Sequence, residues 1–122
     1  MKKPRARRRI INSIIEAIQE KKGEDIISLD LRDLPEAICD FFIICSGSSR
    51  PQIKAIAEEI DMKVKNTHKE NPYYQEGITN LEWVILDYFD IIVHVFEKEK
   101  RAFYKLDELW SDAKLTVYKD YN

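Results

Sequence analysis

The spacing of apolar side chains changes once within residues 81–110, and this change limits the possible folds more than any other feature of the chain. Apolar residues alternate with their neighbours over 82–88 and again over 91–96, which is the period of two that a pleated strand imposes. From Lys98 onward they recur at helical spacing, as Phe103, Leu106, Leu109, Trp110 and Ala113. The segment therefore predicts a β-hairpin followed by one helix, with Trp110 in its buried stripe.

The predicted hairpin turn holds three residues that draw attention to it as a site. Asp87 and Asp90 place two carboxylates around the turn, and Phe89 puts an aromatic ring at its tip. Trp83, at the start of the first strand, is a second aromatic at a chain position typical of interface anchors. The turn is therefore a candidate for either catalysis or docking.

The length of 122 residues predicts a single domain with a core large enough to fold without a staple. Cys39 and Cys45 lie in or beside an apolar run, and no signal-peptide pattern precedes them, which predicts free thiols in a cytoplasmic protein. No apolar run approaches the roughly 20 residues of a membrane span. Two cysteines and two distant histidines lack the spacing of a metal site, so no metal or cofactor is expected.

Charge is distributed unevenly along the chain. The first nine residues contribute +6 to a net charge of −2, so the remainder has a net charge of −8. An acidic body favours a basic macromolecular partner and argues against a broad nucleic-acid-binding face. The basic residues of the arm over 1–9 can reach phosphates, although a solvated, frayed terminus is the commoner meaning of such a run.

The rest of the sequence predicts a compact alternation of helices and strands. A helix over 8–22 ends at Gly23, where a left-handed cap is expected. Strands are predicted over 25–31 and 41–45, and the second, being apolar throughout, suits the centre of a sheet. Ser49 and Gln52 form a capping-box pattern ahead of a second helix, and 73–75 predict a short edge strand.

These elements predict an α+β fold, in which a small mixed sheet has helices packed mainly on one side. The expected organisation is a basic arm over 1–9, one domain over 10–113 and a C-terminal tail over 114–122.

Two patterns invite a catalytic interpretation. Gly47 and Ser48, between a strand and a helix, resemble the glycine–serine loop of nucleotidyltransferases. That chemistry needs carboxylates on one strand face to hold metal ions, whereas Asp87 and Asp90 lie on either side of a turn. Helix capping is therefore the favoured role of the loop. His94 has no neighbouring nucleophile to activate, which favours a packed or partly exposed strand histidine.

Three blocks of sequence resemble the Iojap-like family of ribosomal silencing factors. They are CDFFIICSGSSRPQIKAIAEEI, EWVILDYFDIIVHVF and the following EKEKRAFYKLDELW, with the pair Glu76-Gly77 between the first two. The resemblance covers nearly the whole chain. It implies a non-catalytic protein with a nucleotidyltransferase-like core that lacks catalytic carboxylates. It also implies binding to the large ribosomal subunit through its ribosomal protein fourteen, which blocks joining of the small subunit when nutrients are scarce.

The residue pattern and the resemblance together predict a docking surface. Its expected centre is Trp83, Asp87, Phe89 and Asp90, flanked by Arg101 and Tyr104, with His94 as a lower-ranked member. Phe89 departs from the family, in which glycine is commonest at that position. A glycine takes positive φ without strain, whereas phenylalanine does not. Either the turn differs here or Phe89 adds a contact of its own.

Two alternative functions and the oligomeric state stay open at the level of sequence. One is a metal-dependent nucleotidyltransferase that uses Ser48, Asp87 and Asp90. Another is an RNA-binding module led by the basic arm, which also allows a contact between the arm and ribosomal RNA. Exposed strand edges additionally allow a homodimer off the ribosome.

Overall fold

A mixed six-stranded sheet with helices on both faces forms the structure, a computed structural model that describes residues 4–120, with side chains from Arg7 onward. The strand order is β3-β4-β5-β2-β1-β6. The helices are α1 (Pro4–Glu20), α2 (Arg50–His68), α3 (Lys98–Tyr104) and α4 (Leu106–Leu109). The strands are β1 (Glu24–Asp30), β2 (Phe41–Gly47), β3 (Tyr74–Glu76), β4 (Trp83–Asp87), β5 (Ile91–Glu97) and β6 (Lys114–Val117). The predicted α+β class is confirmed.

The pairing of the strands follows the predicted periodicity. β1 with β2 and β4 with β5 form antiparallel pairs, whereas β2 and β5 run parallel from Phe41 opposite Ile91 to Gly47 opposite Glu97. The two parallel strands lie at the centre of the sheet and are buried on both faces. Their sequences are nearly continuously apolar because a strand that is covered on both sides has no solvent-facing positions.

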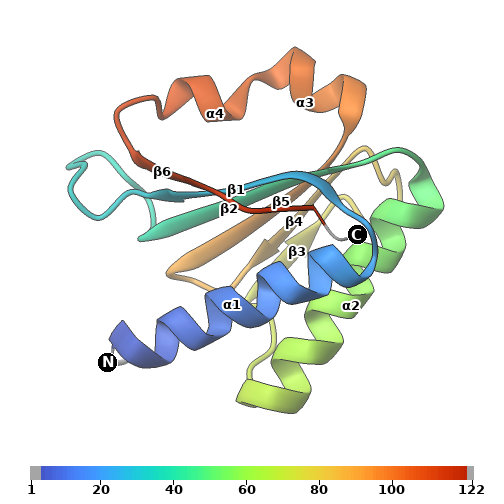
Figure 1. Cartoon of the computed structure of the whole chain (residues 1–122), viewed down its shortest axis with the longest axis horizontal. Coiled ribbons are helices and arrows are strands. Elements are labelled where there is room, and N and C mark those ends of the chain that lie inside the picture. Colours follow the sequence, from blue (N-terminus) through green and yellow to red (C-terminus); the bar gives the residue numbers. More distant parts are fainter. Residues whose placement is uncertain (1–3, 121–122) are drawn as a thin grey trace.

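The two faces of the sheet are covered unequally. Figure 1 shows the long helices α1 and α2 on one face and the short helices α3 and α4 on the other. The larger core cluster lies beneath α1 and α2, and the smaller one, which includes Phe42, Phe96 and Leu106, lies beneath α3 and α4. Packing mainly on one side was therefore a correct prediction, and the short helices close the second face.

The end of α1 differs in detail from the sequence prediction. Lys22, not Gly23, adopts the left-handed conformation, with φ of 65°. Gly23 is required for space instead, because a Cβ there would come within 2.4 Å of Ile18 Cγ2. A glycine after a helix can thus answer a steric need as well as a conformational one.

The single helix predicted over 98–113 is wrong. Lys105 takes a left-handed conformation, with φ of 51°, and separates α3 from α4. The break turns Leu106 into the core but leaves Phe103 and Leu109 about three-quarters exposed. Neither glycine nor proline marks this break in the sequence, so periodicity alone extended the helix through it.

Near both ends of the chain, the described residues form regular elements where an arm and a tail were expected. α1 begins at Pro4, and the side chain of Arg7 is buried, so the described part of the arm belongs to the fold. At the other end, the expected tail supplies β6, which pairs with β1 from Asp30 opposite Lys114 to Ile27 opposite Val117. Lys2 and Lys3 lie outside the described residues. Within the described chain, no helix has the length and apolarity needed to cross a bilayer.

Candidate functional site

The residues predicted to form one site fall into two groups, at opposite ends of the β4–β5 hairpin. Trp83 opens β4 and faces Phe96 near the end of β5, whereas Asp87, Phe89 and Asp90 form the turn. β4 rises over four residue steps between Trp83 and Asp87, which amounts to roughly 13 Å. The sequence predicted one compact binding centre, but the two groups are separated by the length of β4.

The first group is an aromatic cluster, which we define as Trp83, His94, Phe96 and Tyr104. The Trp83 ring stacks on Phe96 with centroids 4.7 Å apart, and Tyr104 lies 4.8 Å from Trp83. Phe96 is fully buried, Trp83 is half-buried and Tyr104 is 47% exposed. The cluster thus grades from the core to the surface, which gives the outer rings a rigid base.

His94 is a buried member of the aromatic cluster and fixes the ring of Trp83. Its ring is buried, and Trp83 Nε1 donates a hydrogen bond to His94 Nδ1 over 3.1 Å. Burial lowers the pKa of His94 to about 3, so the ring is neutral and its Nδ1 is free to accept. The expectation of a packed strand histidine is confirmed. Because it is covered, His94 fixes the orientation of the Trp83 indole and is not itself part of the accessible surface.

Arg101 anchors α3 to the sheet. Its guanidinium donates to the backbone oxygen of Asp25 over 2.6 Å and to Ser46 Oγ over 2.9 Å, and it pairs with Asp107 at 3.2 Å. The side chain is only 12% exposed. Arg101 therefore holds the helix that presents Tyr104, and its own charge is already matched.

Sequence reasoning missed the apolar residues around this cluster. Phe103 and Leu109 were expected in the core but are exposed on α3 and α4. Leu115 and Val117 on β6 are also exposed. Their partners on β1, Leu29 and Ile27, belong to the core beneath α3 and α4, so Leu115 and Val117 lie on the same side of the sheet as the two helices. The helix break at Lys105 is what exposes the first two.

The hairpin tip, which we define as residues 87–90, contains a strained aromatic residue. Phe89 has φ of 81°, and the Asp90 N–H donates to the Tyr88 carbonyl over 3.1 Å, which makes Phe89 the centre of a γ-turn. The Phe89 N–H donates to Asp87 Oδ1 over 2.7 Å. This chain therefore keeps a backbone conformation that suits glycine. The ring is 77% exposed and meets Tyr73 edge to face at 6.2 Å.

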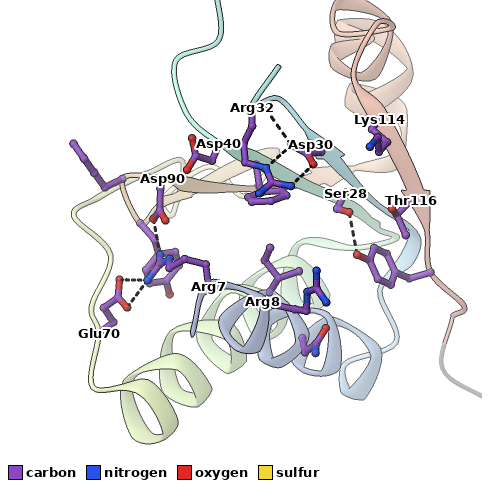
Figure 2. Close-up of a pocket in the computed structure, with 16 residues that line it drawn as sticks. Arg7, Arg8, Ser28, Asp30, Arg32, Asp40, Glu70, Asp90, Lys114 and Thr116 are labelled. Carbon is purple, nitrogen blue, oxygen red and sulfur yellow. Dashed lines mark hydrogen bonds and ion pairs between the residues drawn. The ribbon is translucent and has the colours of Figure 1, made fainter. Parts of the chain in front are cut away.

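Asp90 has a structural ion pair that the sequence did not reveal. Arg7 Nη2 lies 2.6 Å from Asp90 Oδ1, and Arg7 Nη1 lies 2.9 Å from Glu70 Oε2, as Figure 2 shows. The Arg7 side chain is only 7% exposed, so the pairs are largely shielded from water. Asp90 is thus engaged in holding α1 to the hairpin. Arg7 was hidden by its place in a run of basic residues.

The structure separates the residues of the nucleotidyltransferase alternative. Ser48 follows the end of β2, whereas Asp90 precedes the start of β5, which runs parallel beside it, so the two residues lie at opposite ends of these strands. The loop instead caps α2, as predicted: Ser49 Oγ accepts from the Gln52 N–H over 3.3 Å, and the Ser48 N–H donates to Gln52 Oε1 over 2.7 Å. The described residues contain no group of three or more acidic, histidine or cysteine side chains placed to hold a metal ion.

Comparison with known proteins gives consistent relatives. The family model described as "ribosomal silencing factor during starvation" matches residues 4–122. Ribosomal silencing factor RsfS of Bacillus subtilis is 40% identical over 102 residues, covering 81% of this chain and 82% of the relative. The chloroplastic protein Iojap of Zea mays is 36% identical, over 83% of this chain and 43% of that longer protein.

Solved structures agree with these sequence relatives. A crystal structure of a protein from Chromobacterium violaceum superposes with a TM-score of 0.80 at 32% identity, covering 92% of each chain. A second, from Bacillus halodurans, has a TM-score of 0.76 at 30% identity, over 92% of this chain and 98% of that one. The match of the family model to almost the entire chain, with relatives of this identity and coverage, shows that the chain belongs to the family of ribosomal silencing factors.

Proposed function

We propose that this protein represses translation when nutrients are scarce, by binding the large ribosomal subunit through its ribosomal protein fourteen and sterically blocking the small subunit. The observation that supports this most directly is the partly exposed aromatic surface formed by Trp83 and Tyr104 in a chain of this family. The names of the family and its relatives indicate a regulatory factor rather than an enzyme. A cytoplasmic protein fits that role.

The outer rings of the aromatic cluster have the properties of binding anchors. They are large and partly exposed, and Phe96 and His94 hold them in one orientation. Little conformational entropy is therefore lost when a partner covers them. Phe103, which meets Tyr104 edge to face at 5.2 Å, enlarges the apolar area. We place the centre of docking here, and Asp87, Phe89 and Asp90 outside it.

Charge plays a smaller part at this surface than in the sequence-based hypothesis. The whole body is acidic, but α3 and α4 with the linker between them hold almost equal numbers of opposite charges: Lys98, Lys100, Arg101 and Lys105 against Glu99, Asp107 and Glu108. Charge complementarity chiefly affects the rate and orientation of association. We therefore expect apolar contacts to supply most of the affinity for ribosomal protein fourteen.

The proposal is tested by sedimentation with purified large subunits, followed by measurement of their joining to small subunits. Trp83→Ala and Tyr104→Ala are each expected to weaken binding by about 2 kcal/mol, the scale of an interface anchor, and to relieve the block on joining in proportion. Because Trp83→Ala also leaves His94 Nδ1 without its donor, Tyr104→Ala is the cleaner variant.

Met62→Ala is a suitable matched control, because Met62 is half-exposed on α2, on the other side of the sheet. It is expected to bind and silence like the unaltered protein. If Tyr104→Ala, with its fold verified by thermal unfolding, sediments with large subunits as well as Met62→Ala does, the proposed docking surface is wrong. If the unaltered protein binds but subunit joining continues, the occlusion mechanism is wrong.

Two further contacts belong to this proposal. The basic residues that precede Ile10, apart from the ion-paired Arg7, are proposed to meet ribosomal RNA beside the docked protein. Off the ribosome, a homodimer is proposed to form through the outer edge of β6, where Leu115 and Val117 are exposed. Light scattering of Val117→Lys against the unaltered protein tests the dimer, since a charge on that edge should yield monomers.

A further inference from the structure

A hollow of about 810 Å³ lies between α1, the hairpin tip and the part of the sheet formed by β2, β1 and β6. Its partly buried aromatic residues, Phe41 and Tyr118, pack against the core beneath α1 and α2, whereas the aromatic cluster belongs to the opposite face. The proposed docking to ribosomal protein fourteen therefore leaves the hollow without a role. Its volume is in the range of small-ligand pockets, and Figure 2 shows Asp40 and Lys114 at opposite sides of it.

One anion and one cation of the hollow remain unmatched. Four basic and four acidic side chains line it. The ion pairs of Arg7 engage two of the carboxylates, and Arg32 binds both oxygens of Asp30, over 2.9 and 2.8 Å. Arg8 belongs to the basic residues already proposed to meet ribosomal RNA. The other exposed side chains without a hydrogen bond or ion pair to described residues are those of Asp40 and Lys114.

The register of the strands sets the distance between these two residues. Asp30 pairs with Lys114 on one side and with Phe41 on the other, so the three form one row across β6, β1 and β2. Two strand spacings separate the ends of this row by about 10 Å. Asp40 directly precedes Phe41, so its backbone lies at nearly the same distance from Lys114. A single amino acid is too short to reach both charges, whereas three extended residues span roughly 10 Å.

The surface between the two charges suits a peptide. The Tyr118 hydroxyl lies 3.0 Å from Ser28 Oγ, and this hydrogen bond holds the Tyr118 ring in place as an apolar surface. Asn12 on α1 and Thr116 on β6 are exposed and line the hollow. Their side chains can donate to peptide carbonyl groups and accept from peptide N–H groups. The hollow thus offers apolar contact for a side chain and polar contact for a backbone.

We propose that the hollow binds a free peptide of about three residues, with the peptide ammonium group at Asp40 and the peptide carboxylate at Lys114. Such a peptide is a zwitterion, which matches the one anion and one cation that the fold leaves unpaired. Its length matches the row across the three strands. A nucleotide or a polyamine carries charge chiefly of one sign and would leave one of the two groups unmatched.

The test is an NMR titration of the isotope-labelled, full-length protein with glycyl-leucyl-glycine, since shifts of amide signals report both affinity and location. Asp40→Asn and Lys114→Gln are each expected to raise the dissociation constant about threefold to fivefold, the scale of a partly exposed ion pair. Asp33→Asn and Lys119→Gln are matched controls, because both side chains are exposed and neither lines the hollow. They should bind the peptide like the unaltered protein.

Two related ligands test the charges and the length separately. The acetylated amide of the same tripeptide lacks both charges and should bind about tenfold more weakly, the loss of two such ion pairs. Free leucine carries both charges but cannot span the row, so it should lose one pair and bind about threefold more weakly.

Several results would overturn the proposal. Unchanged amide signals of Ser28 and Thr116 at millimolar tripeptide would show that the hollow does not bind it. Equal affinity for the acetylated amide would exclude recognition of the termini, and equal affinity for leucine would contradict the expected span. Losses in the two control variants as large as those in Asp40→Asn and Lys114→Gln would mean a general effect of charge. Because no ribosome is present, each of these results leaves the docking proposal standing.

Discussion

The two ends of the β4–β5 hairpin show contrasting ways of exposing an aromatic residue. At one end, Trp83 stacks on Phe96, and its nitrogen is bonded to a neutral histidine, so the exposed ring is supported by the core. At the other, Phe89 adopts positive φ next to the ion-paired Asp90, and its exposed ring meets the ring of Tyr73. The first surface is stabilised by the fold, whereas the second is strained by it. We interpret the first as a protein-docking anchor and the second as an exposed ring that the fold itself does not use.

Among variants that distinguish the two ends of the hairpin, Arg7→Ala is expected to have the largest effect on stability. The substitution removes the guanidinium that binds the partly buried carboxylates of Glu70 and Asp90, which should lower the free energy of unfolding by about 3 kcal/mol. Chemical denaturation measures the loss. Arg9→Ala, exposed on the same helix, should change stability by less than about 0.5 kcal/mol. Equal effects of the two would show that the ion pairs at the tip contribute little.

The support beneath Trp83 can be tested through pH. The pKa of His94 is about 3 in the fold against an ordinary value of 6.5, so between these values the unfolded chain binds a proton that the folded chain does not. The contribution of His94 to the free energy of unfolding should therefore be complete above pH 6.5. It should decrease as the pH drops below that value, by at most about 1.4 kcal/mol per pH unit. Denaturation between pH 6.5 and 5, above the ordinary carboxylate range, keeps the titration of carboxylates out of this measurement.

His94→Gln should flatten that slope, because glutamine does not titrate. His68→Gln, which removes the other histidine of the chain, is the control and should flatten it less. A slope that His94→Gln leaves unchanged would mean that the buried ring is protonated at little cost, contrary to its desolvated environment.

The smallest expected effect is a gain at the strained tip. Phe89→Gly should raise the free energy of unfolding by about 1 kcal/mol, because glycine adopts positive φ without a Cβ clash. Phe89→Ala keeps the clash and loses the ring, so it should bring no gain. If both variants gain equally in thermal denaturation, the ring rather than the backbone is the source of the strain.

The sequence predicted the elements well where burial produced a regular period. The hairpin, the central strand over 41–45 and the cap formed by Ser49 all appear in the structure. Prediction failed where one side chain decides the outcome. No periodicity reveals that Lys105 turns left-handed, or that Arg7 reaches Asp90 across 83 positions. For the candidate site, residue types were informative about Trp83 and Tyr104, but that His94 and Arg101 lie beneath the surface follows only from their packing in the folded chain.

The position of β6 has a consequence for synthesis of the chain. β1 lies between β2 and β6, and its outer neighbour β6 follows all the other described strands in the sequence, so it is made after them. Until residues 114–117 emerge, the nascent protein presents the free backbone groups of β1 along one sheet edge, a template for pairing with another chain. Chains that terminate before Lys114 are therefore expected to aggregate even with their core sequence intact. The segment that resembles a dispensable tail in the sequence therefore protects the edge of β1 from pairing with another chain.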